Sequence, residues 1–166
     1  MYFLCHNIGV PPDTRPQVRA NYNTREQIAG CKGILTFDGV YKNVYENRDV
    51  LSGKQFTLFV TGNYIGLDNT FDIGMPIERY CTIKEIESIG GEIGWHTWSH
   101  RDLTTLTESE ILQEVTPPEW MSTNLFAYPY GRYNDLVLDI VSSMYEKAFS
   151  VISTDGTEMT IPRSYL

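Results

Sequence analysis

Short apolar runs alternate with segments of helical spacing along most of this chain, and this alternation limits the folds open to it. The apolar runs that predict strands cover residues 2–5, 33–37, 55–60, 92–95, 124–128 and 148–152. Capping boxes at Thr82/Glu85 and Thr107/Glu110 open two predicted helices, and residues 136–144 keep the spacing of a third. This order of elements indicates βαβ units and a mainly parallel sheet.

The chain length then separates a complete barrel from a partial one. Each βα unit of an eight-fold barrel takes about 30 residues, and this chain has 166. We therefore expect an α/β fold, a distorted, incomplete (β/α) barrel, in a single domain over residues 1–166. Residues 40–51 predict a further helix, residues 11–30 predict mostly loop with one helical turn at most, and residues 63–76 predict an irregular loop.

Charge and composition exclude several classes of partner. The net charge of −8 argues against nucleic acid or an anionic membrane, because either would repel the protein. No apolar run approaches the roughly 18 residues of a membrane span, and the N-terminus lacks the pattern of a signal peptide, so we expect a cytoplasmic protein. Cys5, Cys31 and Cys81 have no metal-site spacing, so we expect reduced thiols.

Polar side chains collect at the ends of the predicted strands. His6 follows the first strand, Asp38 the second and His96 the fourth, and the turn at residues 128–131 follows the fifth. The carboxyl ends of parallel strands are where α/β proteins place their sites. We therefore expect His6 to reach the same cleft as His96.

His96 and His100 form the strongest single motif. They are two of only three histidines, and they would share a face if residues 96–100 turned helically. Two neutral imidazoles on one face are ligands for a divalent transition metal. The plainer alternative is a polar loop with two unrelated histidines, and for Asp38 it is a helix N-cap.

These residue types together suit metal-assisted hydrolysis of an amide or an ester. Two histidines can hold a Lewis acid that polarises a carbonyl group and activates water. Asp38 can take a proton from that water, and His6 can return a proton to a leaving amine, although a structural buried histidine is the alternative for His6. A backbone N–H of the turn at residues 128–131 can face the oxyanion.

Four stretches carry a family resemblance: Thr-Phe-Asp at 36–38, Gly-Trp-His-Thr-Trp-Ser-His at 94–100, the Leu-Thr…Glu-Ile helix pattern at 103–114, and Phe-Ala-Tyr-Pro-Tyr-Gly at 126–131. They resemble the motifs of a polysaccharide deacetylase of the NodB-homology type (carbohydrate esterase family 4), from about Leu4 to Arg163. Leu-Cys-His-Asn-Ile at 4–8 is similar to the poly-N-acetylglucosamine deacetylase subgroup, which carries its last histidine motif at the N-terminus. The resemblance implies a distorted (β/α) barrel that hydrolyses N-acetyl groups of amino sugars.

The resemblance also implies a role for each matched residue. Asp38 would be the catalytic base, His6 the acid, His96 and His100 the metal ligands, and the Tyr130 N–H the oxyanion donor. The implied partner is an N-acetylated sugar or a polysaccharide precursor, and the implied cofactor is a divalent metal, expected to be zinc. The residues expected to contact the substrate are Trp98, Tyr128, Pro129, Tyr130, Gly131 and Arg163.

Two positions depart from the family pattern. Gly39 stands where the family has a second aspartate that binds the metal, and Ala127 stands where it has an arginine that orients the base, for which Arg163 is a candidate substitute. We therefore expect weak metal binding, which Gly39→Asp would strengthen if the φ angle at this position is negative. The alternative functions are a NodB-like carbohydrate-binding protein without hydrolysis and a metal-independent C–N hydrolase.

Overall fold

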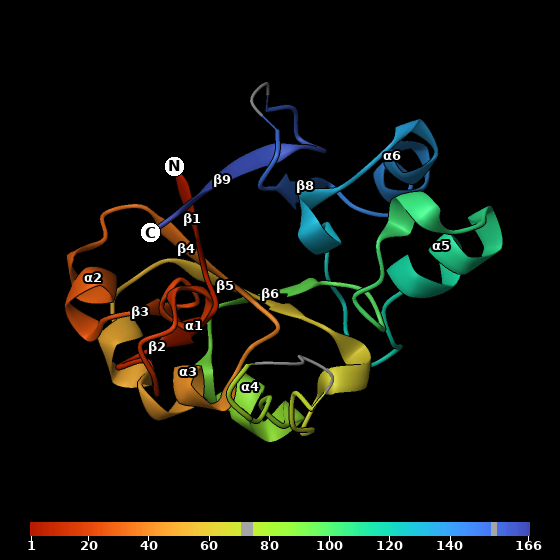
Figure 1. Ribbon diagram of the computed structural model, residues 1–166. Coiled ribbons are helices and arrows are strands. Elements are labelled where there is room, and N and C mark those ends of the chain that lie inside the picture. Colours follow the sequence, from red (N-terminus) through yellow and green to blue (C-terminus); the bar gives the residue numbers. More distant parts are fainter. Residues whose placement is uncertain (71–74, 154–155) are drawn as a thin grey trace.

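Seven parallel strands close into a barrel in the computed structural model, which describes residues 1–70, 75–153 and 156–166 (Figure 1). The barrel strands are β1 (Tyr2–Cys5), β4 (Ile34–Asp38), β5 (Phe56–Val60), β6 (Glu92–Trp95), β7 (Leu125–Ala127), β8 (Lys147–Ser150) and β9 (Ile161–Tyr165). This confirms the expected distorted (β/α) barrel, which is incomplete in having seven strands instead of eight but is nevertheless closed. Part of the predicted loop at 63–76 lies outside the described residues.

Closure depends on the last strand. β1 pairs with β4 on one side and with β9 on the other, where Tyr2 lies opposite Arg163. The order then runs β4, β5, β6, β7, β8, β9, and each of these pairs is parallel. The contact between β6 and β7 is the weakest, with the single pair Trp95 and Phe126 in register. The barrel is therefore distorted at this point.

Helices cover the outside of the barrel (Figure 1). They are α1 (Pro16–Arg19), α2 (Arg25–Gly30), α3 (Lys42–Glu46), α4 (Ile83–Ile89), α5 (Glu108–Val115) and α6 (Asp135–Ser142), with short 3-10 turns η1 (Arg48–Leu51), η2 (Gly62–Tyr64), η3 (Leu103–Thr105) and η4 (Pro129–Gly131). The two predicted capping boxes both form and open α4 and α5. None of the helices among the described residues is long and apolar enough to cross a membrane.

The stretch at 11–30 differs from the expectation of a loop. It contains α1, α2 and the strand β3 (Tyr22–Asn23), which pairs in parallel with β2 (Asn7–Ile8) outside the barrel. A third capping box, formed by Thr24 and Gln27, opens α2. These elements are two to six residues long, so they show no hydrophobic period in the sequence.

Side chains alternate between the two faces of each barrel strand, and the two faces belong to different hydrophobic clusters. Phe37, Leu58 and Trp95 belong to the large buried cluster that includes residues of the covering helices. Phe59 and Phe149 form a smaller cluster with their rings 5.2 Å apart. Because successive strand residues face opposite sides, Asp38 lies on the opposite side of β4 from Phe37. Asp38 therefore faces the inside of the barrel.

Candidate active site

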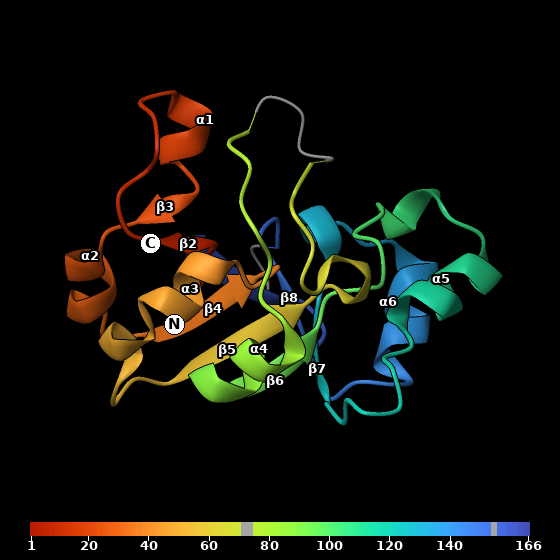
Figure 2. The ribbon, with the colours of Figure 1, turned by 90° about the horizontal axis from the view of Figure 1, so that it is seen from below.

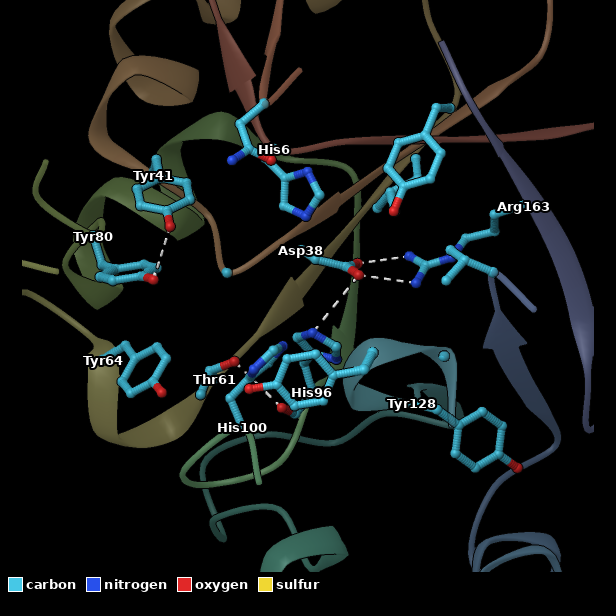
Figure 3. Close-up of a pocket in the computed structure, with 17 residues that line it drawn as sticks. His6, Asp38, Tyr41, Thr61, Tyr64, Tyr80, His96, His100, Tyr128 and Arg163 are labelled. Carbon is cyan, nitrogen blue, oxygen red and sulfur yellow. Dashed lines mark hydrogen bonds and ion pairs between the residues drawn. The ribbon is translucent and has the colours of Figure 1, made fainter. Parts of the chain in front are cut away.

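A cavity of about 490 Å³ lies at the carboxyl ends of the barrel strands (Figure 3). Each of the seven barrel strands contributes one lining residue at its end or just beyond it: His6, Asp38, Thr61, His96, Tyr128, Val151 and Tyr165. His6 lines the same cavity as His96 and His100, so its predicted placement is confirmed. Strand ends bring together residues that are far apart in the sequence.

Asp38 ends β4, and a buried arginine holds its carboxylate. The guanidinium of Arg163 donates to both oxygens, with Nη1–Oδ1 and Nη2–Oδ2 distances of 2.6 and 2.8 Å. Burial alone would raise the pKa of Asp38, but the charge of Arg163 and its hydrogen bonds hold that pKa well below its usual range. Asp38 is therefore ionised. Its alternative role as a helix cap is wrong, because Tyr41 is the N-cap of α3.

His96 is fixed in one tautomer by a backbone carbonyl. Its Nδ1 lies 2.7 Å from the oxygen of Ala127, which can only accept, so Nδ1 carries the hydrogen. Burial lowers the pKa of His96, and the Asp38 charge opposes this only in part, so the ring is neutral. The free Nε2 then faces Asp38 Oδ2 at 3.6 Å (Figure 3). Two electron-rich atoms face each other there, an arrangement that favours a cation between them.

The two histidines converge through a strained turn and not through a helix. Thr97 and His100 have φ angles of 70° and 55°, in the left-handed region that residues with a side chain avoid. The imidazole rings nevertheless lie with centroids 4.7 Å apart. Burial lowers the pKa of His100 to about 3, so this ring is neutral as well. The expected convergence is thus present, although its assumed helical cause is wrong.

The segment at 61–64 holds this turn along its whole length. The carbonyl oxygens of residues 96, 97, 98 and 99 accept, in order, from Thr61 Oγ1, Gly62 N, Asn63 N and Tyr64 Oη, at 2.8–3.2 Å. A Cβ atom at Gly62 would lie 2.4 Å from Trp98 Cε3, so only glycine permits this approach. The strain of the turn is therefore offset by neighbouring hydrogen bonds.

Helix α5 holds the other side of the turn. Glu114 is 7% exposed, and its carboxylate accepts from the backbone N–H of Ser99 at 2.9 Å and from the Ser99 hydroxyl. The C-terminal end of α5 also contacts two tryptophan side chains. Trp95 Nε1 donates to the Glu114 carbonyl, and Trp98 Nε1 donates to the Thr116 carbonyl. These contacts use carbonyl groups that a helix C-terminus leaves without partners.

The residues predicted to contact the substrate divide into two groups. Tyr128, Tyr130, Gly131 and Arg163 line the cavity, whereas Pro129 and Trp98 are not among its lining residues. The hydroxyl of the buried Tyr128 donates to the Met159 carbonyl and points away from Asp38 (Figure 3). The indole of Trp98 instead packs edge-on against Trp95, with ring centroids 5.1 Å apart, and contributes to the support of the histidine turn.

Three tyrosines that sequence reasoning missed line one wall of the cavity. They are Tyr41, Tyr64 and Tyr80 (Figure 3). The rings of Tyr41 and Tyr80 stack with centroids 4.4 Å apart, and the Tyr80 hydroxyl donates to the Tyr41 hydroxyl at 3.0 Å. The position of Tyr41 just beyond the end of β4 is a usable signal, whereas Tyr80 arrives through an isolated bridge that the sequence does not reveal.

Gly39 lines the cavity in a conformation that disfavours any other residue. Its φ angle is 81°, and an added Cβ atom would lie 3.0 Å from Tyr80 Cε1. The negative φ angle on which the predicted gain from Gly39→Asp depended is absent. In the part of the chain that the structure describes, no three His, Cys, Asp or Glu side chains group as a metal site, and the imidazoles that line the cavity are those of His6, His96 and His100.

The sequence matches the family model described as polysaccharide deacetylase over residues 32–148. It is 31% identical to a chitin deacetylase of Pestalotiopsis over 120 residues, which are 66% of this chain and 38% of that protein. It is 35% identical over 85 residues to an uncharacterized protein of Geobacillus stearothermophilus, covering 49% of this chain and 28% of that protein. The chain thus spans about a third of the length of these curated relatives.

Solved structures share the fold over nearly the whole chain. The Streptococcus pyogenes deacetylase PplD superposes with a TM-score of 0.75 at 17% identity, covering 99% of this chain and 91% of that one. IcaB from Ammonifex degensii superposes with a TM-score of 0.74 at 16% identity and with the same coverage. At these identities the similarity concerns the barrel architecture.

Proposed function

This chain belongs to the polysaccharide deacetylase family, of the NodB type of carbohydrate esterase, and from this premise we propose that it removes acetyl groups from N-acetylated sugars. The reaction would hydrolyse the C–N bond of an acetamido group to acetate and a free amine. The observation that carries the proposal is the meeting of Asp38, His96 and His100 in one cavity at the strand ends. We further propose one catalytic domain over residues 1–166 in a cytoplasmic protein.

The histidine pair suits a divalent cation. NodB-type carbohydrate esterases are generally metal-dependent, and the free Nε2 of His96 faces an ionised carboxylate at 3.6 Å. His96 and His100 would hold the ion, which we expect to be zinc, with water completing the shell in place of the ligand that Gly39 lacks. When bound, it would polarise the acetyl carbonyl and acidify water.

Asp38 is the proposed base and Arg163 its positioning residue. Asp38 would accept a proton from water as the water oxygen attacks the acetyl carbon. The two hydrogen bonds from Arg163 fix the carboxylate plane, but they also lower its basicity. Arg163 comes from β9, on the far side of β1 from β4, and would take the place of the family arginine that aligns with Ala127.

His6 is the proposed acid. Burial lowers its pKa, so the ring is neutral before the reaction and can take up a proton in one step and pass it on in the next. It would protonate the sugar nitrogen as the C–N bond breaks. His6 lines the same cavity as Asp38, which places both groups of the proposed acid–base pair at one site.

The turn at 128–131 would bind the acetyl group. Tyr130 has a φ angle of 57°, and its ring packs edge-on against His100 with centroids 4.7 Å apart. We assign its backbone N–H to the developing oxyanion, next to the histidine pair. Tyr128 and Gly131 would form the adjoining wall.

A carbohydrate-binding protein without hydrolysis is the second candidate. It is favoured by Gly39, which offers no ligand, and by the engagement of both Asp38 oxygens with Arg163. In this case the aromatic cavity would hold a sugar without cleaving it.

Acetate release from N-acetylglucosamine oligomers tests the proposal. Protein supplied with zinc should release acetate, and protein treated with a chelator should not. Turnover that survives complete chelation would favour a metal-independent hydrolase. Oligomer binding without acetate release, with or without zinc, would favour the carbohydrate-binding candidate.

A further inference from the structure

A second cavity of about 460 Å³ lies beside the N-terminal segment. It is lined on one side by residues 8–12 and on another by residues 76–78, and Asn43 of α3 also contributes. Figure 2 shows that the segment carrying α1 and the segment at residues 75–82 that leads into α4 project from the same side of the barrel. A cavity of this size is within the usual range for ligand pockets.

Neighbouring residues of the same chain segments line the first and the second cavity. Four stretches line both cavities, and in each a residue of the first cavity lies one or two positions from a residue of the second, in the pairs His6/Ile8, Asn21/Tyr22, Tyr41/Asn43 and Tyr80/Glu78. Two residues of extended chain span at most about 7 Å. A polymer with one unit in the first cavity therefore has the second within reach.

Glu78 is an acidic residue that lines the second cavity. Its carboxylate is half-buried, and Asn43 Nδ2 donates to Oε1 at 3.3 Å. In residues 1–70, 75–153 and 156–166 no salt bridge joins Glu78 to a cation. Arg25 lines the same cavity, but Asp49 and Asn47 accept its hydrogen bonds at 3.0 and 2.9 Å. Burial raises the pKa of Glu78 to about 7, with no charged neighbour opposing it.

A half-buried carboxylate without a counter-ion is costly in the free protein. A cation that enters the cavity would relieve this cost and form a charge-assisted hydrogen bond. The net charge of −8 also favours a cationic polymer over an anionic one. Tyr22, Val10 and Ile77 add aromatic and apolar surface that suits the faces of a sugar ring.

We propose that the second cavity binds a sugar unit with a free amino group, next to the unit in the catalytic cavity, with Glu78 as the acceptor for its ammonium group. This inference rests on the proposed function, because the deacetylation reaction produces amino sugars. The protein would then bind a partly deacetylated polymer better than a fully acetylated one. An amino sugar formed by one round of deacetylation would then bind in the second cavity and place a neighbouring acetylated unit of the polymer in the catalytic cavity.

Binding of a glucosamine tetramer tests this inference, because the protein has no acetyl group to remove from it. Glu78→Gln keeps the shape of the side chain and removes the charge, whereas Glu119→Gln removes an exposed charge outside the cavity. By calorimetry, Glu78→Gln should weaken binding about tenfold relative to wild type, and Glu119→Gln should not. Equal affinity of the two variants would overturn the proposal.

A second measurement needs no change at Glu78. In the Asp38→Asn variant, which slows turnover, a glucosamine tetramer with one N-acetylated unit should bind more tightly than the fully N-acetylated tetramer, and the preference should shrink as salt is added. A preference for the fully N-acetylated tetramer would overturn the proposal. Acetate release by the wild type is measured separately. If the enzyme is active but binding of the glucosamine tetramer does not depend on Glu78, only the proposal about the second cavity is contradicted.

Discussion

Removing Arg163 should destabilise the fold far more than losing a surface ion pair would. Arg163→Met keeps the length of the side chain but leaves the Asp38 carboxylate, which is 8% exposed, without its two charged hydrogen bonds. Breaking a buried pair in this way typically costs about 3–5 kcal/mol. That is a large fraction of the roughly 5–15 kcal/mol that stabilises a typical domain.

A double-mutant cycle separates the ion pair from the contact between the Arg163 guanidinium and Phe59, whose ring centroid lies 5.5 Å from the guanidinium carbon. Asp38→Asn leaves a buried guanidinium with one acceptor fewer. The double variant Asp38→Asn/Arg163→Met removes both charges, so its loss of stability should be smaller than the sum of the single losses by about 2–3 kcal/mol.

Urea unfolding at pH 7, followed by far-ultraviolet circular dichroism, gives these free energies of unfolding. A loss below about 1 kcal/mol for Arg163→Met, the range of exposed pairs, would show that burial does not make this ion pair important for stability. So would additive single losses, because they would show that the two charges do not depend on each other in the folded protein.

Three further predictions concern the histidine turn and one residue of each cavity. Glu114→Ala should cost about 2 kcal/mol in urea unfolding through the lost bonds to Ser99, whereas Glu114→Gln should keep most of this stability; equal losses would contradict the role of Glu114. Gly39→Asp should lower stability by about 1 kcal/mol and leave zinc affinity in calorimetry unimproved, because of its φ angle of 81°; tighter zinc binding would contradict this. Glu78 has a pKa raised from 4.5 to about 7, so the folded state holds its proton more tightly and stability should fall as the pH rises from 4.5 to 7. Glu78→Gln should reduce this loss of stability with pH. By thermal unfolding at pH 8, the variant should be about 1 kcal/mol more stable than wild type, a figure reduced for the partial exposure of Glu78. An unchanged dependence of stability on pH would contradict the raised pKa of Glu78.

The central part of the site was predictable because it follows from strand order. His6, Asp38 and His96 each end or follow a strand that the apolar pattern reveals, and parallel strands bring such ends together. The pairing of Arg163 with Asp38 needed one further fact, the closure of the barrel by β9. Residues 161–165 were not predicted as a strand, and Pro162 works against that reading of the sequence.

The rest of the site depends on backbone geometry that the sequence does not show. The left-handed φ angles of Thr97 and His100 arise from the hydrogen bonds of residues 61–64 and Glu114, which come from two other segments. The same applies to Gly39, whose positive φ angle overturned the condition for a gain of metal affinity. The stacked Tyr41 and Tyr80 meet through an isolated β-bridge between distant segments.

The role of Asp38 as the base is tested by the kcat/KM for acetate release from an N-acetylglucosamine tetramer, compared between wild type and Asp38→Asn. Asp139→Asn on α6 is the matched control, because it removes an exposed carboxylate away from the cavity. If Asp38 is the base, Asp38→Asn should lower kcat/KM about 10²–10⁴-fold while the control keeps the wild-type value. Wild-type acetate release by a folded Asp38→Asn variant would contradict the account.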